Sequence, residues 1–284
     1  MNKAVKITIV VDNKAGSGLD SEHGFAAWIE AFGRRILFDT GQGHVLAGNA
    51  ARLGIPLDKT DHVVLSHGHY DHGGGIVQVM EQSVSAIIHL HPHALIDRYS
   101  LDTNFQSRPV GLSEETVSFL DSLPPERVHW ITHSEYIAPG IGLTGPIPRT
   151  DSDEDVGGPF YTDLKGSSKD IIEDDQALWI DTDQGLVVCS GCAHSGIINT
   201  LNCIKNITGK TRIRCVVGGF HLMGAGISRV QKTVNELENI SPELIAPCHC
   251  TGDEACVLMK KRLGNRFVDC MAGTEIVLPL TEKE

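Results

Sequence analysis

The sequence lacks a long hydrophobic run, a dense block of lysine and arginine, and any cysteine before residue 189. Without about 20 consecutive apolar residues, no segment is expected to span a bilayer. The formal net charge of -12 disfavours nucleic-acid binding, because that affinity comes largely from neutralised phosphates. The apolar stretch at residues 7–11 is too short for the core of a signal peptide. We therefore expect a cytoplasmic protein that binds neither membranes nor nucleic acids.

All cysteines lie beyond residue 188, whereas a disulfide framework is typical of small secreted proteins. The spacings Cys189-x-x-Cys192 and Cys248-x-Cys250 leave a cluster-binding or redox role open. The interpretation that we favour is reduced thiols packed near a metal site. The other cysteines are Cys203, Cys215, Cys256 and Cys270.

The length of 284 residues and the alternation of strand-like and helix-like segments predict one α/β domain over residues 1–284. In the first half, a strand at 62–65 leads through three glycines to a helix ending near residue 81 and a strand at 85–90. In the second half, strands at 185–189, 212–217 and 244–246 alternate with helices at 197–205 and 230–240. Residues at about 98–175 contain repeated prolines and an acidic run, which predict an irregular, lid-like insertion.

The most informative segment is Ser66-His67-Gly68-His69-Tyr70-Asp71-His72, which follows an apolar strand. In an extended backbone, the imidazoles of His67 and His69 can converge on one ion. Asp71 and His72 can reach a neighbouring ion as the chain turns into a helix. Imidazole nitrogen and carboxylate oxygen are ligand types that zinc accepts. The segment therefore predicts a metal site.

Three further histidines follow predicted strands of the second half. His194 and His249 each lie just past the carboxyl end of a strand, where open α/β folds place functional groups. We predict both as metal ligands. His221 occupies a similar position after Gly218-Gly219-Phe220. It is either a metal ligand or proton donor that lines the site, or a histidine that hydrogen-bonds to the backbone.

The pattern His67-x-His69-x-Asp71-His72, preceded by Phe38-Asp39-Thr40-Gly41, resembles that of the metallo-β-lactamase superfamily. Within the superfamily, the chain resembles the subfamily named for dihydropterin–ribofuranosylaminobenzene phosphate synthase. The motifs that carry this resemblance include residues 191–196, 218–222 and 248–252. The resemblance implies an αββα sandwich built from two βα halves, with metals at one edge. It also implies that many relatives carry an aspartate that bridges two metals where this chain has Gly218-Gly219-Phe220-His221. Without that aspartate, we expect either one tightly and one weakly bound metal, or His221 in part of the aspartate's role.

The resemblance further implies a division of labour among the site residues. His67, His69 and His194 would bind one ion, and Asp71, His72 and His249 would bind the other. Asp71 would also act in catalysis, by orienting the attacking water or accepting its proton, and Asp39 would orient a ligand imidazole from outside the ligand set.

The resulting prediction is a hydrolase that uses one or two metal ions to activate water. Zn²⁺ is the expected ion, with Mn²⁺ or Fe²⁺ as alternatives. The substrate would be a small phosphorylated or acyl-type molecule, related to pterins if the subfamily likeness holds. Asn104, Arg149 and Tyr161 are candidate substrate contacts, although each could equally be a surface-loop residue.

Two other functions stay open at this point. One is a diiron redox protein on the same fold, although such proteins usually carry a glutamate where this chain has His69. The other is a non-catalytic module that uses the metal for ligand binding.

Overall fold

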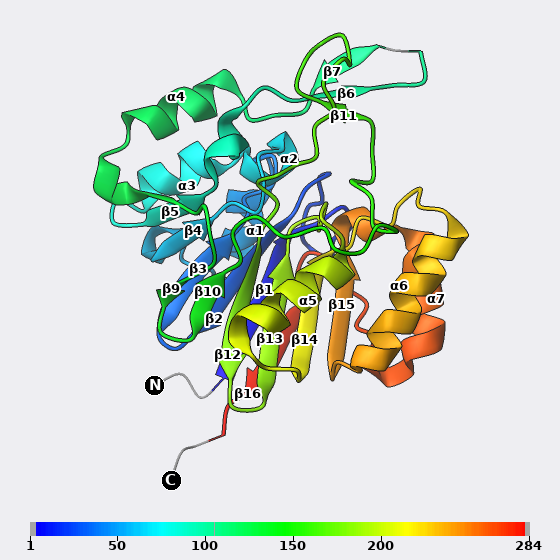
Figure 1. The fold of residues 1–284 in the computed structure, drawn as a ribbon. Helices are drawn as coiled ribbons and strands as arrows, with labels where there is room; N and C mark the ends of the chain where they lie inside the picture. Colours follow the sequence, from blue (N-terminus) through cyan, green and yellow to red (C-terminus); the bar gives the residue numbers. More distant parts are fainter. Residues whose placement is uncertain (1–3, 105, 282–284) are drawn as a thin grey trace.

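Two β-sheets pack face to face in the computed structural model, which describes residues 4–104 and 106–281 (Figure 1). The first sheet runs in spatial order through β16 (Glu275–Pro279), β1 (Ala4–Val11), β2 (Ala26–Ala31), β3 (Arg34–Phe38), β4 (His62–Val64), β5 (Ile87–Leu90) and β8 (Val128–Trp130). The second runs through β15 (Leu244–Cys248), β14 (Ile213–Gly219), β13 (Gly185–Ser190), β12 (Ala177–Thr182), β10 (Ile141–Leu143) and β9 (Glu135–Ala138). Each sheet combines a parallel part, β3-β4-β5-β8 or β13-β14-β15, with an antiparallel part.

Helices cover the outer face of each sheet (Figure 1). On the first sheet lie α1 (Leu46–Arg52), α3 (Ile76–Gln82) and α4 (Glu114–Ser122). On the second lie α5 (Ile197–Thr208), α6 (Ile227–Ile240) and α7 (Asp253–Leu263). The short α2 (Tyr70–Gly73) contains Asp71 and His72. Single 3-10 turns cover Leu57–Lys59, Pro92–Leu95, Pro125–Arg127, His249–Thr251 and Gly264–Arg266.

The core has three layers, which follow from the side-chain periodicity of the strands and helices. Every residue of β13 and β14 is buried, as expected for parallel strands covered on both faces. Successive residues point to opposite sides, so Val187 packs between the sheets and Val188 packs under the helices. Helix α6 buries Val230, Val234 and Leu237, which recur on one helical face. The αββα sandwich implied by the sequence is therefore confirmed.

The middle segment is more ordered than its composition indicates. Helix α4 and strands β8, β9 and β10 lie within residues 98–175 and belong to the sandwich itself. The part that projects is a small sheet of β11 (Phe160–Tyr161), β6 (Tyr99–Leu101) and β7 (Ser107–Pro109), seen at the top of Figure 1. This projecting sheet and the loop near residues 155–160 overhang one edge of the sandwich.

That edge is formed by the carboxyl ends of parallel strands from both sheets. Asp39 follows β3, His67 follows β4, His194 follows β13 and His249 follows β15. Because parallel strands end at a common edge, residues more than 200 positions apart meet there. Within the described ranges, no helix is long and apolar enough to cross a membrane.

Candidate metal centre

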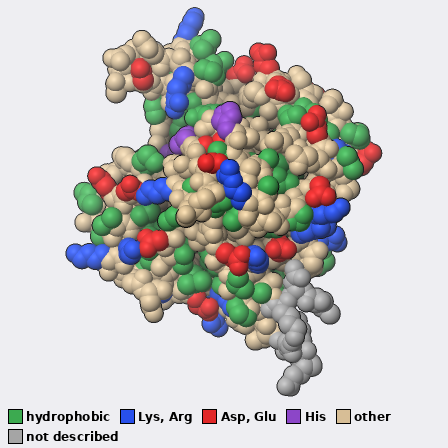
Figure 2. Space-filling view, turned by 180° about the vertical axis from the view of Figure 1, so that it is seen from behind, with side chains coloured by type: hydrophobic (Ala, Val, Ile, Leu, Met, Phe, Trp, Pro, Cys, Tyr) green, Lys and Arg blue, Asp and Glu red, His purple; other side chains and the backbone are tan. Residues whose placement is uncertain are grey.

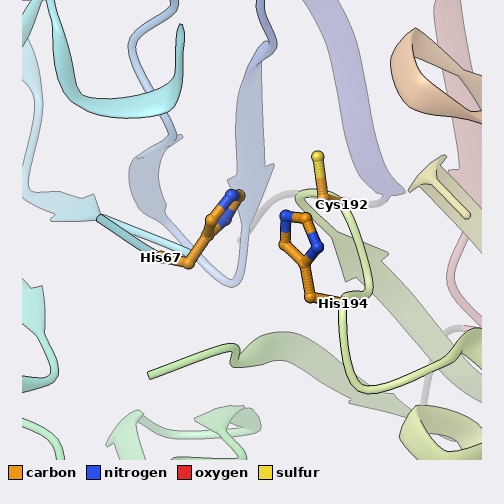
Figure 3. Close-up of side chains that lie close together, drawn as sticks. All are labelled: His67, Cys192 and His194. Atoms are coloured by element: carbon orange, nitrogen blue, oxygen red, sulfur yellow. The ribbon is translucent and has the colours of Figure 1, made fainter. Parts of the chain in front are cut away.

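The first cluster of potential ligands comprises His67, His69, Cys192 and His194. His67 Nε2 lies 2.9 Å from His69 Nδ1, and the His194 ring centroid lies 4.7 Å from that of His67 and 5.0 Å from that of His69. The donor atoms of His67, Cys192 and His194 all lie within 4.8 Å of one another. Figure 3 shows these three side chains close together; they come from the segments that follow β4 and β13.

The second cluster contains Asp71, His72 and His249, together with Cys192 and His23. Asp71 Oδ2 lies 3.6 Å from His249 Nε2 and 3.8 Å from His72 Nε2. His23 Nε2, from the loop before β2, lies 3.2 Å from the same oxygen. His72, Cys192 and His249 again have donor atoms within 4.8 Å of one another. The structure thus brings together both sets of residues that the sequence predicts as ligands.

Asp39 lies beside both clusters and connects them through hydrogen bonds to Ser66 and His72. Its carboxylate accepts hydrogen bonds from Ser66 N–H, from Ser66 O–H and from His72 Nδ1, each at 2.7 Å. Ser66 Oγ also lies 2.9 Å from His67 Nδ1. A carboxylate and a hydroxyl therefore fix the ring orientation of one histidine in each cluster, which is the position expected of Asp39 from the sequence.

His194 and His249 are oriented in the same way by other partners. His194 Nδ1 lies 2.8 Å from the Val156 carbonyl oxygen, and His249 Nδ1 lies 2.9 Å from Asn13 Oδ1. Each ring therefore turns its Nε2 atom toward the centre. In the described part of the chain, the buried Nε2 atoms of His69, His194 and His249 have no hydrogen-bond partner. Buried nitrogens without partners are costly unless a ligand satisfies them, so the residues fit a bound metal.

Burial also keeps most of these imidazoles in the ligating form. Burial, with the neighbouring imidazoles, lowers the pKa values of His67 and His194, and it lowers the pKa of His249 to about 4. Burial alone would lower the pKa of His72 too, but the carboxylates of Asp39 and Asp71 outweigh it and raise that pKa to about 9. A carboxylate pair thus supplies negative charge where the second cluster would hold a cation.

The backbone at this edge is strained in several places. Among the described non-glycine residues, Asp39, Ala193, His221 and His249 have φ between 45° and 59°. Residues other than glycine rarely adopt this left-handed backbone conformation, which costs of order 1 kcal/mol or more per residue. Its concentration where the donor atoms converge indicates a built site.

His221 lies beside the first cluster with its ring centroid 4.3 Å from that of His194. Its Nε2 lies 3.0 Å from the Gly157 carbonyl oxygen, and its buried Nδ1 has no hydrogen-bond partner among the described atoms. Cys192, His221 and Cys250 form a further group of donors within 4.8 Å. His221 therefore makes the backbone hydrogen bond considered from the sequence, and its role as a metal ligand or proton donor stays a prediction.

A cavity of about 220 Å³ opens above the two clusters. Besides the histidines, it is lined by Tyr70, Arg108, Phe160, Met223 and other residues of the edge. Figure 2 shows histidine side chains at the surface beside the projecting sheet. Arg108 comes from β7 of the projecting sheet, and of the described lining residues it alone is a lysine or arginine.

The three side chains predicted to contact substrate lie elsewhere. Arg149 donates hydrogen bonds to the carbonyl oxygens of His194, at 2.6 Å, and Ile171. Tyr161 pairs with Tyr99 in the projecting sheet, and Asn104 lies in an exposed turn with Asp102. None of the three is among the described residues that line the cavity.

Comparison with known proteins identifies the family. Residues 21–201, well over half of the chain, match the family described as the metallo-beta-lactamase superfamily. The chain belongs to the metallo-β-lactamase superfamily.

Individual relatives match almost the full length of the chain. An uncharacterized protein of Methanocaldococcus jannaschii is 34% identical over 263 residues, 92% of this chain and 96% of the relative. A second protein of that organism, named 7,8-dihydropterin-6-methyl-4-(beta-D-ribofuranosyl)-aminobenzene-5'-phosphate synthase, is 29% identical over 285 residues and 95% of each chain. The crystal structure of Tm1679, described as a metal-dependent hydrolase of the beta-lactamase superfamily, has a TM-score of 0.82 at 32% identity and covers 97% of this chain and 99% of that one. The predictions of family, fold and hydrolase class are confirmed.

His23 and Arg108 of this metallo-β-lactamase centre were not expected from the sequence alone, and Cys192 was expected only as one of the thiols near a metal site. His23 lies in a polar loop far ahead of the motif, and Arg108 lies in the projecting sheet, so no spacing pattern links either to the site. Cys192 did have a signal. It precedes His194 by two residues, the same spacing that joins His67 to His69.

Proposed function

We propose that the chain hydrolyses a small anionic substrate, phosphorylated or acyl-type, at a centre that binds two divalent ions, most simply Zn²⁺. The observation that carries the proposal is the convergence of two donor clusters beside one cavity, where the Nε2 atoms of His69, His194 and His249 have no hydrogen-bond partner among the described residues. Imidazole, carboxylate and thiolate are the ligand types that zinc accepts.

When bound, such ions lower the pKa of water and stabilise negative charge that develops on the substrate. The chain's own residues supply the positioning. His67, His69 and His194 would hold one ion, and His72, His249 and Asp71 the other. Asp71 Oδ2 also lies at the cavity wall beside His23 Nε2, at 3.2 Å. Burial opposes its ionisation, but His72, His23 and His249 lower its pKa, so Asp71 stays a carboxylate that can orient water. Its role as a proton acceptor stays a prediction, because a lowered pKa makes a carboxylate a weaker base.

The cavity wall supports an anionic substrate. Arg108 lines the cavity with a permanent positive charge, and guanidinium groups bind phosphate or carboxylate oxygens in a bidentate manner. Tyr70, Phe160 and Met223 offer flat or apolar contacts beside it. A pterin-related phosphate would meet both requirements, and the name of the 29% identical relative supports that choice. The contacts predicted for Asn104, Arg149 and Tyr161 stay predictions.

A substrate panel tests the proposal. Zinc-loaded and chelator-treated protein would be assayed on a phosphomonoester, a phosphodiester, a lactone and a thioester. We expect metal-dependent hydrolysis of at least one anionic member and its loss in His67→Ala/His69→Ala. Arg108→Met should raise KM for that substrate by about tenfold, because a charged hydrogen bond contributes about 1.5 kcal/mol.

The matched control is Arg212→Met, whose exposed side chain pairs with Glu243 away from the site. It should leave KM unchanged. Cleavage of no substrate by zinc-loaded protein would contradict the hydrolytic proposal and favour the ligand-binding module, and bound iron with redox-active absorbance would favour the diiron alternative.

A further inference from the structure

The two donor clusters have one member in common, which is Cys192. Its Sγ belongs both to the group with His67 and His194 and to the group with His72 and His249. The Sγ atom lies 3.2 Å from His72 Nε2, and the side chain is buried at 3% exposure. Among the described donor groups of the two clusters, no other side chain belongs to both.

The strand end that carries a bridging aspartate in many relatives has no space for one here. A Cβ atom at Gly219 would lie 2.5 Å from Cys250 Sγ and 2.4 Å from the Gly191 carbonyl oxygen. A Cβ atom at Gly218 would lie 1.9 Å from the Ser190 carbonyl oxygen. Phe220 is fully buried between the second sheet and the helices that cover it, and the His221 ring hydrogen-bonds to Gly157. The two clusters therefore lack a shared carboxylate from β14.

From this geometry we propose that the Cys192 sulfur is the bridging ligand of the metal centre, as a thiolate shared by both ions in place of a carboxylate. The loop that follows β13 supports this position. Cys192 and His194 are separated by Ala193, whose φ of 56° turns the chain so that both side chains face the centre. Figure 3 shows the Cys192 and His194 side chains on this loop, with the His67 ring beside that of His194.

Cys250 is the main rival for a sulfur ligand. Its Sγ contacts the Cys192 carbonyl oxygen at 3.6 Å, and its donor group contains Cys192 and His221 only. It therefore lies to one side of the pair of clusters. If Cys250 served one ion and Cys192 the other, the centre would contain two terminal thiolates and no bridge.

X-ray absorption at the zinc edge separates these arrangements, because Zn–S bonds are about 2.3 Å long and Zn–N bonds about 2.0–2.1 Å. In protein that holds two zinc ions, one bridging sulfur gives an average of about one sulfur per zinc, whereas one terminal sulfur gives about half. We expect about one in the wild type and in Cys250→Ala, and none in Cys192→Ala. The buried core cysteine Cys189 supplies the control, and Cys189→Ala should match the wild type.

The inference rests on the proposed metal centre, but the two can fail separately. Zinc-loaded wild type that binds no ion would overturn the proposed function. Two bound ions without a sulfur shell, or with about half a sulfur per ion, would overturn only the bridge. A fall to half in Cys250→Ala, or a single ion with one sulfur in the wild type, would also overturn it. The wild-type and Cys250→Ala spectra together decide the matter even if Cys192→Ala fails to fold.

Discussion

Replacing Asp39 with asparagine tests how the protein holds its metal ligands in place. The Asp39 carboxylate accepts hydrogen bonds from two groups of Ser66 and from His72 Nδ1, all at 2.7 Å in a fully buried position. Asparagine has the same shape but offers one oxygen and one amide group, so an N–H must face at least one former donor. If the amide faces His72, that ring must move its proton to Nε2, the nitrogen that faces Cys192.

The size of the effect follows from these contacts. Loss of a partner that orients a ligand histidine typically weakens metal binding by about 10–100-fold. One unsatisfied buried donor lowers the free energy of unfolding by about 1–3 kcal/mol. Zinc affinity would be measured by competition with a chromophoric chelator, and stability by thermal unfolding of metal-free protein.

A second carboxylate provides the control for Asp39→Asn. Asp39 follows β3, whereas Asp61 precedes the neighbouring strand β4, at the opposite edge of the sheet, and pairs with Arg35. Asp61→Asn should lower stability without changing zinc affinity. Wild-type zinc affinity in Asp39→Asn would refute the reasoning.

Three further predictions concern groups around the centre. Burial raises the pKa of Asp175 to about 6 in the folded chain, above its ordinary value of 3.8, so the metal-free protein should gain roughly 3 kcal/mol from this group as the pH falls through 6 toward 4. Asp175→Asn should remove that part of the pH dependence in urea unfolding, and an unchanged slope would contradict the assignment. Gly191→Ala would place a Cβ 2.0 Å from Ser66 Oγ and 2.8 Å from Asp39 Oδ2. We therefore expect the free energy of unfolding to fall by about 1–3 kcal/mol and bound zinc to be lost. The control Gly48→Ala, whose Cβ would have no atom within 4 Å, should keep the wild-type stability and zinc content. Arg149→Met should weaken zinc binding severalfold and leave KM unchanged, because Arg149 hydrogen-bonds to the His194 backbone. A raised KM with normal zinc content would instead favour the substrate contact predicted from the sequence.

The sequence was sufficient where chemistry and strand ends coincide. Three histidines and an aspartate within six residues have few alternatives to a metal site, and His194 and His249 each follow an apolar strand. Parallel strands end at a common edge, so the meeting of these residues could be predicted without coordinates.

The sequence was insufficient where position depends on tertiary packing. Cys189 and Cys192 are three residues apart, yet Cys189 is in the core and Cys192 is in the centre, because β13 ends between them at Ser190. Strands β9 and β10 have only four and three residues, too few to show alternation. Strand β10 forms by pairing with β12, and β9 forms by pairing with β10. Arg108 reaches the cavity only because the projecting sheet overhangs it.

The most direct test of the account is the zinc content of the purified chain, measured by mass spectrometry with inductively coupled plasma after zinc loading and gel filtration. The account predicts two ions per chain in the wild type, and at most one in either His67→Ala/His69→Ala or His72→Ala/His249→Ala. Wild-type zinc content in both double variants would contradict it.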